Sequence, residues 1–397
     1  MAFFHNRTVN LINLHYTIGQ IAQGGGGAFF AIYLLKSGLS VPGTLLALAA
    51  IFATRLAIRS ALLPVAVRVG LRPLVIGGAL MMGVSFLFLA HVHGGVNASL
   101  YRLVIVAAVA DTVYWPSYHA YFAALGDEEH RGQQTGLREA IGALVGTVSP
   151  LVAGWLLVTF GPVAAFYATG GVQALSAIPL FWTPDVPVVR HAPGAFRTAF
   201  SIAMLFIGDG WVAAGYFVTW QVALFLSLGE NVLAYGGALA IAALVGAVTG
   251  LFLGRLIDSG KGTRVVWYAV GVGALVVMMR ASAGHNPTLA VIANALGALV
   301  GCIYVPTMMT AVYNTAKRSA CVMRFHIAAE GGWDIGVSTG LAFGALLVWL
   351  GVPVAWTILF SLVGLAFVFV LLQRYYARHP AEAVEADQTQ GEEAVRI

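Results

Sequence analysis

The sequence predicts an all-α integral membrane protein with twelve transmembrane helices in two six-helix bundles related by an internal repeat. Hydrophobic residues make up 59% of the 397 residues and charged residues only 9%, with a mean hydropathy of +0.86. These values lie far from the averages of soluble domains. Apolar stretches of at least the ~20 residues that span a bilayer occur twelve times along the chain.

The twelve stretches are predicted to be helices. They are long and rich in Leu, Ala, Val and Gly, whereas the strands of a membrane β-barrel would alternate over about 10 residues. They begin near these residues: Leu11, Val41, Pro73, Leu100, Thr135, Val163, Ala199, Val232, Val265, Leu289, Ile327 and Val354. The first stretch contains His15, Gln20 and Gln23 and has no clear cleavage site, so we expect a helix there and not a signal peptide.

An internal repeat divides the chain into two halves. One constant offset aligns the following pairs without a gap: Tyr114 with Tyr304, Pro116 with Pro306, Gly142 with Gly332, Gly146 with Gly336, Gly154 with Gly344 and Gly161 with Gly351. Such repeats are typical of secondary transporters, whose substrate site lies near the midplane between the repeats. The predicted bundles are residues 1–183 and 198–376. The proline-rich residues 184–197 are predicted to be a cytoplasmic linker, and the acidic residues 377–397 a disordered cytoplasmic tail.

The distribution of basic residues predicts the orientation. One side collects thirteen of them: Arg7, Arg68, Arg72, Arg131, Arg190, Arg197, Arg255, Lys261, Arg264, Lys317, Arg318, Arg374 and Arg378. The other side has Lys36 and Arg280. By the positive-inside rule both termini are cytoplasmic, in a multi-pass protein of the cell membrane. The net charge of +5 therefore reflects topology. Basic clusters with interleaved aromatics are absent from the sequence, so a nucleic-acid partner is not expected.

The segment GRLIDSGKGTR, residues 254–264, joins the eighth and ninth helices. It resembles the cytoplasmic loop motif of the major facilitator superfamily, and the resemblance covers roughly residues 8–375. The equivalent first-half loop, residues 64–72, has Ala66 where the family's aspartate falls. The fifth helix contains SPLVAG, residues 149–154, a degenerate form of a motif associated with proton-driven exporters. The resemblance implies alternating access and slightly favours export.

The loop motif predicts a cytoplasmic gate formed by Gly254, Asp258 and Gly260. Asp258 lies where two helices turn, and an acceptor there can bind backbone amides or basic side chains in only one of two conformations. The alternative is a solvated turn aspartate beside Lys261.

His326, Glu330 and Asp334 occur at four-residue intervals within an apolar segment. On a helix they face the same way, with neighbours about 6 Å apart, and ionisable residues within a membrane are costly. Two carboxylates so close in a low dielectric will not both ionise, so we expect this stripe to carry a transferable proton.

Two alternatives remain open for this stripe. The first is a structural ion pair with Arg324, Arg138 or Arg59. The second is a site for a transition metal such as Zn²⁺ or Mn²⁺, in a transporter of metals or metal chelates or, less favoured, in a membrane-embedded metalloenzyme. The sequence has no His-Glu-x-x-His or nucleophile-base pattern, so we expect no enzyme and no cofactor.

Other polar residues fall on helices that line the central cavity in the family the chain resembles. Asp111 and Asp209 are predicted proton carriers because burial of a carboxylate at such depth is costly. The remaining candidates suit an organic substrate: Gln20, Trp115, Tyr118, His119 and Trp211. The alternative for the aromatic residues is packing between helices.

Arg55 and Arg59 also lie four residues apart and are predicted to bind substrate. Paired guanidinium groups suit a carboxylate or phosphate, which leaves an anionic substrate open. The alternative is ion pairing with Glu139 or with the acids of the eleventh helix. Altogether the sequence predicts a monomeric secondary transporter that moves a small organic solute by alternating access, coupled to protons.

Overall fold

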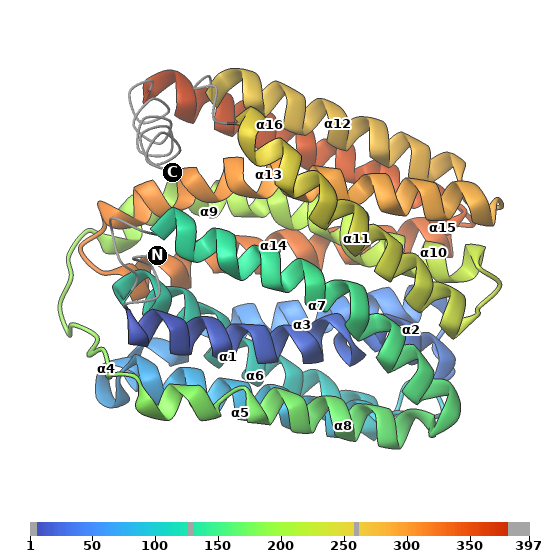
Figure 1. Ribbon diagram of the computed structural model, residues 1–397, viewed down its shortest axis with the longest axis horizontal. Coiled ribbons are helices and arrows are strands. Elements are labelled where there is room, and N and C mark those ends of the chain that lie inside the picture. The colour runs from blue at the N-terminus through green and yellow to red at the C-terminus, as the bar shows by residue number, and fades with distance from the viewer. Residues whose placement is uncertain (1–5, 126–130, 258–261, 380–397) are drawn as a thin grey trace.

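The computed structural model describes residues 6–125, 131–257 and 262–379. Within these ranges every regular element is a helix, and the helices form two bundles that lie side by side (Figure 1). The first bundle contains α1 (Arg7–Gly24), η2 (Gly26–Phe29), α2 (Phe30–Lys36), α3 (Val41–Ile58), η3 (Arg59–Ala61), α4 (Leu62–Val69), α5 (Leu71–Leu89), α6 (Ala98–Leu125), α7 (Arg131–Thr159), α8 (Gly161–Leu175) and η4 (Ile178–Trp182).

The second bundle repeats this order. It contains α9 (Ala195–Val212), η5 (Ala213–Thr219), α10 (Trp220–Ser227), α11 (Val232–Ile257), α12 (Gly262–Ser282), α13 (Pro287–Lys317), α14 (Val322–Trp349), α15 (Val354–Thr357), η6 (Ile358–Phe360) and α16 (Ser361–Arg378). Eleven helices among the described residues are long and apolar enough to cross a membrane, and α7 adds the shorter apolar stretch Leu144–Thr159. The predicted membrane architecture is thereby confirmed.

The helix bounds follow the repeat. The offset that aligns Tyr114 with Tyr304 moves α6 to 288–315, where α13 spans 287–317, and moves α7 to 321–349, where α14 spans 322–349. Pro116 and Pro306 lie inside α6 and α13 at equivalent positions. The internal repeat inferred from the sequence is therefore also a structural one.

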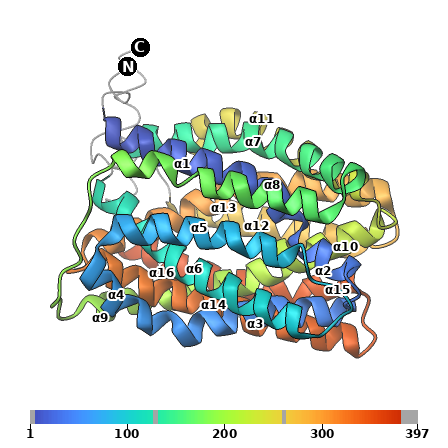
Figure 2. The ribbon, with the colours of Figure 1, turned by 90° about the horizontal axis from the view of Figure 1, so that it is seen from below.

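Two pairs of helices make the most extensive contacts between the bundles: α3 with α14, and α7 with α11. Figures 1 and 2 show each pair running side by side along the length of the molecule. In the repeat, α3 corresponds to α11 and α7 to α14, so the two connections are equivalent.

The first span of each half is broken at the same place. The alignment that pairs Gln20 with Asp209 also pairs residues 24–30 with the π-helix η5, residues 213–219. Residues 24–30 contain the 3₁₀ segment η2. A side chain at Gly26 would collide with Thr169, 2.2 Å from its hydroxyl oxygen. In η5, Arg280 Nη1 donates to the Tyr216 carbonyl at 2.6 Å. Arg280 lies in the last turn of α12, near a helix end as the sequence placed it, but its side chain is buried inside the second bundle.

The linker between the bundles is held on both sides. Asp185 Oδ1 accepts from the Arg72 backbone N–H at 3.0 Å, and the Val186 carbonyl accepts from Leu71 N–H at 3.0 Å. On the other side, the Arg324 guanidinium donates to the carbonyls of Val189 and Arg190, both at 2.8 Å.

The helices overrun the predicted boundaries slightly. The helix α9 begins at Ala195, so the last three residues of the proposed linker are helical, and α16 runs to Arg378. The rest of the proposed tail, residues 380–397, lies outside the described residues. The chain starts α1 and finishes α16 at the same end of the molecule (Figure 1), as an even number of spans requires.

Candidate functional site

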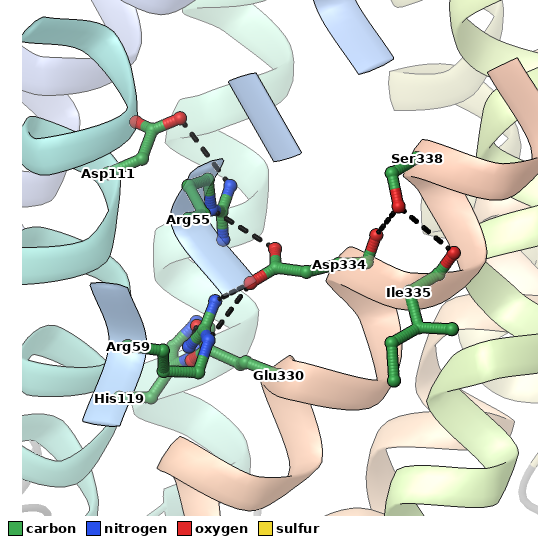
Figure 3. Close-up of polar contacts among 8 residues, drawn as sticks. All are labelled: Arg55, Arg59, Asp111, His119, Glu330, Asp334, Ile335 and Ser338. Atoms are coloured by element: carbon green, nitrogen blue, oxygen red, sulfur yellow. Dashed lines mark hydrogen bonds and ion pairs between the residues drawn. The ribbon is translucent and has the colours of Figure 1, made fainter. Parts of the chain in front are cut away.

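Asp334 lies where α14 of the second bundle meets α3 of the first. Its carboxylate is fully buried and contacts both arginines of the predicted pair: Arg59 Nε lies 2.9 Å from Oδ2, and Arg55 Nε lies 3.1 Å from Oδ1 (Figure 3). Arg59 Nη2 contacts the same carboxylate. Because guanidinium groups remain charged and present several donors in a fixed fork, one buried aspartate joins two arginines here.

Glu330, one helical turn earlier on α14, extends this arrangement to a third helix. Its Oε2 lies 3.3 Å from Arg59 Nη1, and its Oε1 lies 2.9 Å from Nδ1 of His119 on α6. Among the described partners proposed from the sequence, Arg59 contacts the stripe. Arg324 binds the linker instead, and the side chains of Arg138 and Glu139 lie outside the described residues.

Asp111 on α6 occupies the other end of the arrangement. Its Oδ2 lies 3.4 Å from Arg55 Nη1, and its side chain is 25% exposed, whereas that of Asp334 is fully buried. Six residues thus form a chain in which acidic and basic groups alternate, which we call the charged network and which Figure 3 shows together. Its members in order are Asp111, Arg55, Asp334, Arg59, Glu330 and His119.

The charged network lacks one positive charge when His119 is neutral. It contains two arginines and three carboxylates, so these described residues then sum to one excess negative charge. An uncompensated charge in a medium of low dielectric is costly. One further positive charge, from a proton or a bound cation, is therefore favoured here.

His326 completes the predicted stripe but makes different contacts. Its ring centre lies 5.6 Å from that of His119, and its buried Nε2 has no hydrogen-bond partner within the described part of the chain. One potential ligand atom from each of His119, His326 and Glu330 lies within 4.8 Å of the others. A tetrahedral Zn²⁺ site with bonds of about 2.1 Å needs ligand separations of about 3.4 Å, so a modest side-chain movement would close this group around a metal. Asp334 is not part of it.

A cavity of about 360 Å³ lies between the bundles beside the charged network. Its polar lining residues are Gln23, Ser85, Asp111 and Gln221, and its aromatic lining residues are Phe30, Phe52, Phe86 and Phe217. The lining comes from the first two spans, α5 and α6 of one half and from η5 and α10 of the other. Both helix breaks therefore border the cavity, as sites near unwound segments do in other transporters.

All seven predicted substrate residues lie outside the cavity lining. Three of them, Arg55, Arg59 and His119, belong to the charged network. Tyr118 is 1% exposed and stacks on Tyr16 and Tyr114. Trp211 donates to Thr339 Oγ1 at 2.9 Å. In both cases the contacts are those of packing between helices. Trp115 is half-buried beside the ring of His119, and Gln20 is half-buried on α1, nearly one turn before Gln23.

Asp209 on α9 is buried and separate from the charged network. Its Oδ1 accepts from the Tyr304 hydroxyl at 2.8 Å. The repeat partner Tyr114 contacts Nε2 of the buried His15 at 2.9 Å. Each half thus places the hydroxyl of the equivalent tyrosine against a buried titratable group on its first span, a pairing that no local sequence signal indicated.

Only one residue of the predicted gate lies among the described residues. Asp258 and Gly260 lie outside the described residues, and Gly254 belongs to the last turns of α11. At the equivalent first-half loop, Ala66 is fully buried in α4, and the carboxylate beside that loop comes from Asp185 of the linker. Asp185 lies more than a hundred residues away along the chain, so the loop sequence contains no sign of it.

A family model described as Major Facilitator Superfamily matches residues 15–331 of the chain. Among curated proteins, none matches it.

Proposed function

The chain belongs to the Major Facilitator Superfamily, whose members are secondary transporters of small solutes, and we propose that it couples transport of an organic solute to protons by alternating access. The observation that supports this most is the charged network, because it joins α3 and α6 of one bundle to α14 of the other. Any motion that separates α3 from α14 must break these buried ion pairs. Their strength therefore decides which conformation is favoured.

Proton coupling follows from the charge of the network. While α3 and α14 are in contact, Arg55 and Arg59 together offset the charges of Glu330 and Asp334. When the bundles separate there, the two carboxylates lose these partners, and protonation is the simplest way for them to avoid an unpaired charge. Protonation of Glu330 and Asp334 would thus favour the separated state, and loss of these protons the joined state.

The test is substrate accumulation driven by an imposed pH gradient in proteoliposomes. Glu330→Gln and Asp334→Asn should each abolish accumulation, because neither amide can release a proton, while equilibrium binding of substrate persists. Glu230→Gln is the matched control, since it removes an exposed carboxylate between α10 and α11, outside the network. If both amide variants still concentrate substrate as the wild type does, the proton path lies elsewhere, with Asp209 as the next candidate.

We further propose that both termini are cytoplasmic and that the protein acts as a monomer in the cell membrane. The charged network then lies in the cytoplasmic half, because His326 and Glu330 come early in α14. The conformation described is accordingly closed toward the cytoplasm, and export would load the solute after this end opens. Tags at both termini of intact cells should resist labelling from outside, and a C-terminal tag that reacts would contradict this orientation.

A second candidate is transport of a divalent transition metal by His119, His326 and Glu330. The unpaired Nε2 of His326 favours it, as does the proximity of the three potential ligand atoms. Zn²⁺ bound to the purified protein should then disappear in His326→Ala and persist in His285→Ala, whose histidine is exposed in the loop before α13. Absence of bound metal from the wild type would eliminate this candidate.

A further inference from the structure

The cavity and the charged network together indicate the chemical class of the substrate. Asp111 belongs to both, and it is the ionisable residue of the described cavity lining. Four phenylalanines, Phe30, Phe52, Phe86 and Phe217, are among the other lining residues. An apolar wall with one carboxylate suits a ligand that has an apolar body and one positive charge.

The two arginines are not available to an anion in this conformation. Arg55 and Arg59 are each 3% exposed, and their guanidinium groups are held by the carboxylates of Asp334 and Glu330. The guanidinium carbon of Arg55 lies 5.1 Å from the ring centre of Phe52. Phe52 lines the cavity, whereas Arg55 is not one of its lining residues. An anionic substrate would have to displace a buried carboxylate and leave it unpaired, which is strongly unfavourable.

Asp111, in contrast, is accessible. Its contact with Arg55 is 3.4 Å long, beyond the 2.7–2.9 Å of a strong charge-assisted hydrogen bond, and a quarter of its side chain is exposed. The lining aromatic faces can also attract a cation through their ring quadrupoles. The excess negative charge of the network makes a cation next to Asp111 favourable.

We propose that the cavity binds an organic monocation whose charge pairs with Asp111, and that this cation and the coupling proton neutralise the same excess negative charge. Binding of one cation then releases one proton from the network, so atoms and charge balance without any other reactant. This inference rests on the proposed function, because it assigns the substrate class of that transporter.

The experiment is titration calorimetry of the purified full-length protein with two ring compounds of opposite charge. Phenyltrimethylammonium should bind, and benzenesulfonate should not. Asp111→Asn should weaken the binding of phenyltrimethylammonium at least tenfold, while Glu230→Gln, which removes an exposed carboxylate, retains wild-type affinity. Equal affinity in Asp111→Asn, or tighter binding of benzenesulfonate than of the cation, would overturn the substrate class.

A second variant guards against misfolding of Asp111→Asn. Ala107, one turn before Asp111 on α6, also lines the cavity, so Ala107→Phe should block phenyltrimethylammonium while leaving every charge in place. Unchanged binding in this variant would show that the cation binds outside the cavity and would overturn the proposal.

Repeating the titration in two buffers of different ionisation enthalpy measures proton release. Release of one proton per cation is expected. Cation binding that depends on Asp111 but releases no proton would agree with the proposed substrate class and contradict proton exchange. The substrate class and the proton coupling are therefore tested separately.

Discussion

The two connections between the bundles are equivalent by the repeat and differ completely in chemistry. At α3 and α14, buried arginines meet buried carboxylates. At α11 and α7, small residues meet backbone: a side-chain carbon on Gly236 would lie 2.8 Å from the Pro150 carbonyl oxygen, and one on Gly146 would lie 3.4 Å from the side chain of Ala243. One connection is charged, and the other is closely packed and apolar.

The sequence of each half accounts for this difference. The offset of the repeat pairs network residues with uncharged ones: Asp111 with Gly301, His119 with Met309, Glu330 with Ala140 and Asp334 with Leu144. The glycines and prolines that shape the helices are kept at the same offset. Backbone geometry is therefore duplicated, whereas the groups that can bind a proton or a cation occur in one copy. Because the helix backbones are duplicated, either connection between the bundles can separate. Because the charged residues are not duplicated, the two resulting conformations differ in charge.

The largest effect should come from removing a partner at the charged connection. Arg59→Leu leaves Glu330 and Asp334 without their main cation, and breaking such a buried pair costs about 3–5 kcal/mol. Unfolding in detergent, followed by circular dichroism, measures this loss. Adding Asp334→Asn restores the original charge sum and should recover part of the stability. A double variant that loses the full sum of both single effects would show that the two side chains do not interact.

A smaller effect is expected at the apolar connection. Gly236→Ala forces α11 away from the Pro150 carbonyl, and overpacking of this kind costs about 1–3 kcal/mol. Gly237→Ala is the matched control, because a side-chain carbon there would meet nothing within 4 Å. Equal stability of the two variants, measured by thermal unfolding, would mean that α7 and α11 are not packed as closely as described.

The smallest effect concerns salt. Since the network residues are almost entirely buried apart from Asp111 and His119, mobile ions should screen them little. The stability difference between wild type and Arg59→Leu should therefore change by less than about 1 kcal/mol between 0.05 and 1 M NaCl. A difference that shrinks steadily with salt would indicate that water fills the charged connection and would remove the contrast between the two.

The parts of the fold that depend on local pattern could be predicted from the sequence. The spans follow from hydropathy, and the repeat follows from glycines and prolines at a fixed offset. The members of the site were predicted as separate candidates: an acidic stripe, an arginine pair, and Asp111 and His119 on another helix. That these residues form one network was not predicted. His119 and Glu330 are 211 residues apart in the sequence, and no periodic pattern relates residues so far apart.

Other features could not be predicted because tertiary contacts decide them. From the sequence, Arg280 counts only as a basic residue near a helix end, yet Tyr216 offers it a carbonyl and an aromatic face inside the bundle. Tyr118 resembled a substrate contact, yet neighbouring tyrosines enclose it. From the sequence, only the position of a polar group along its own helix is known. Whether that group faces a cavity or a neighbouring helix depends on how all the helices are arranged.

The linker limits how far the two bundles can part. Its Val186 carbonyl is fixed to α5 of the first bundle, and its Val189 carbonyl is fixed by Arg324 to α14 of the second. Three residues separate these anchors, and a fully extended chain of that length reaches about 11 Å. The linker therefore allows only a small separation of its two anchors. Wider opening at this end must first break the hydrogen bonds between the linker and Arg324.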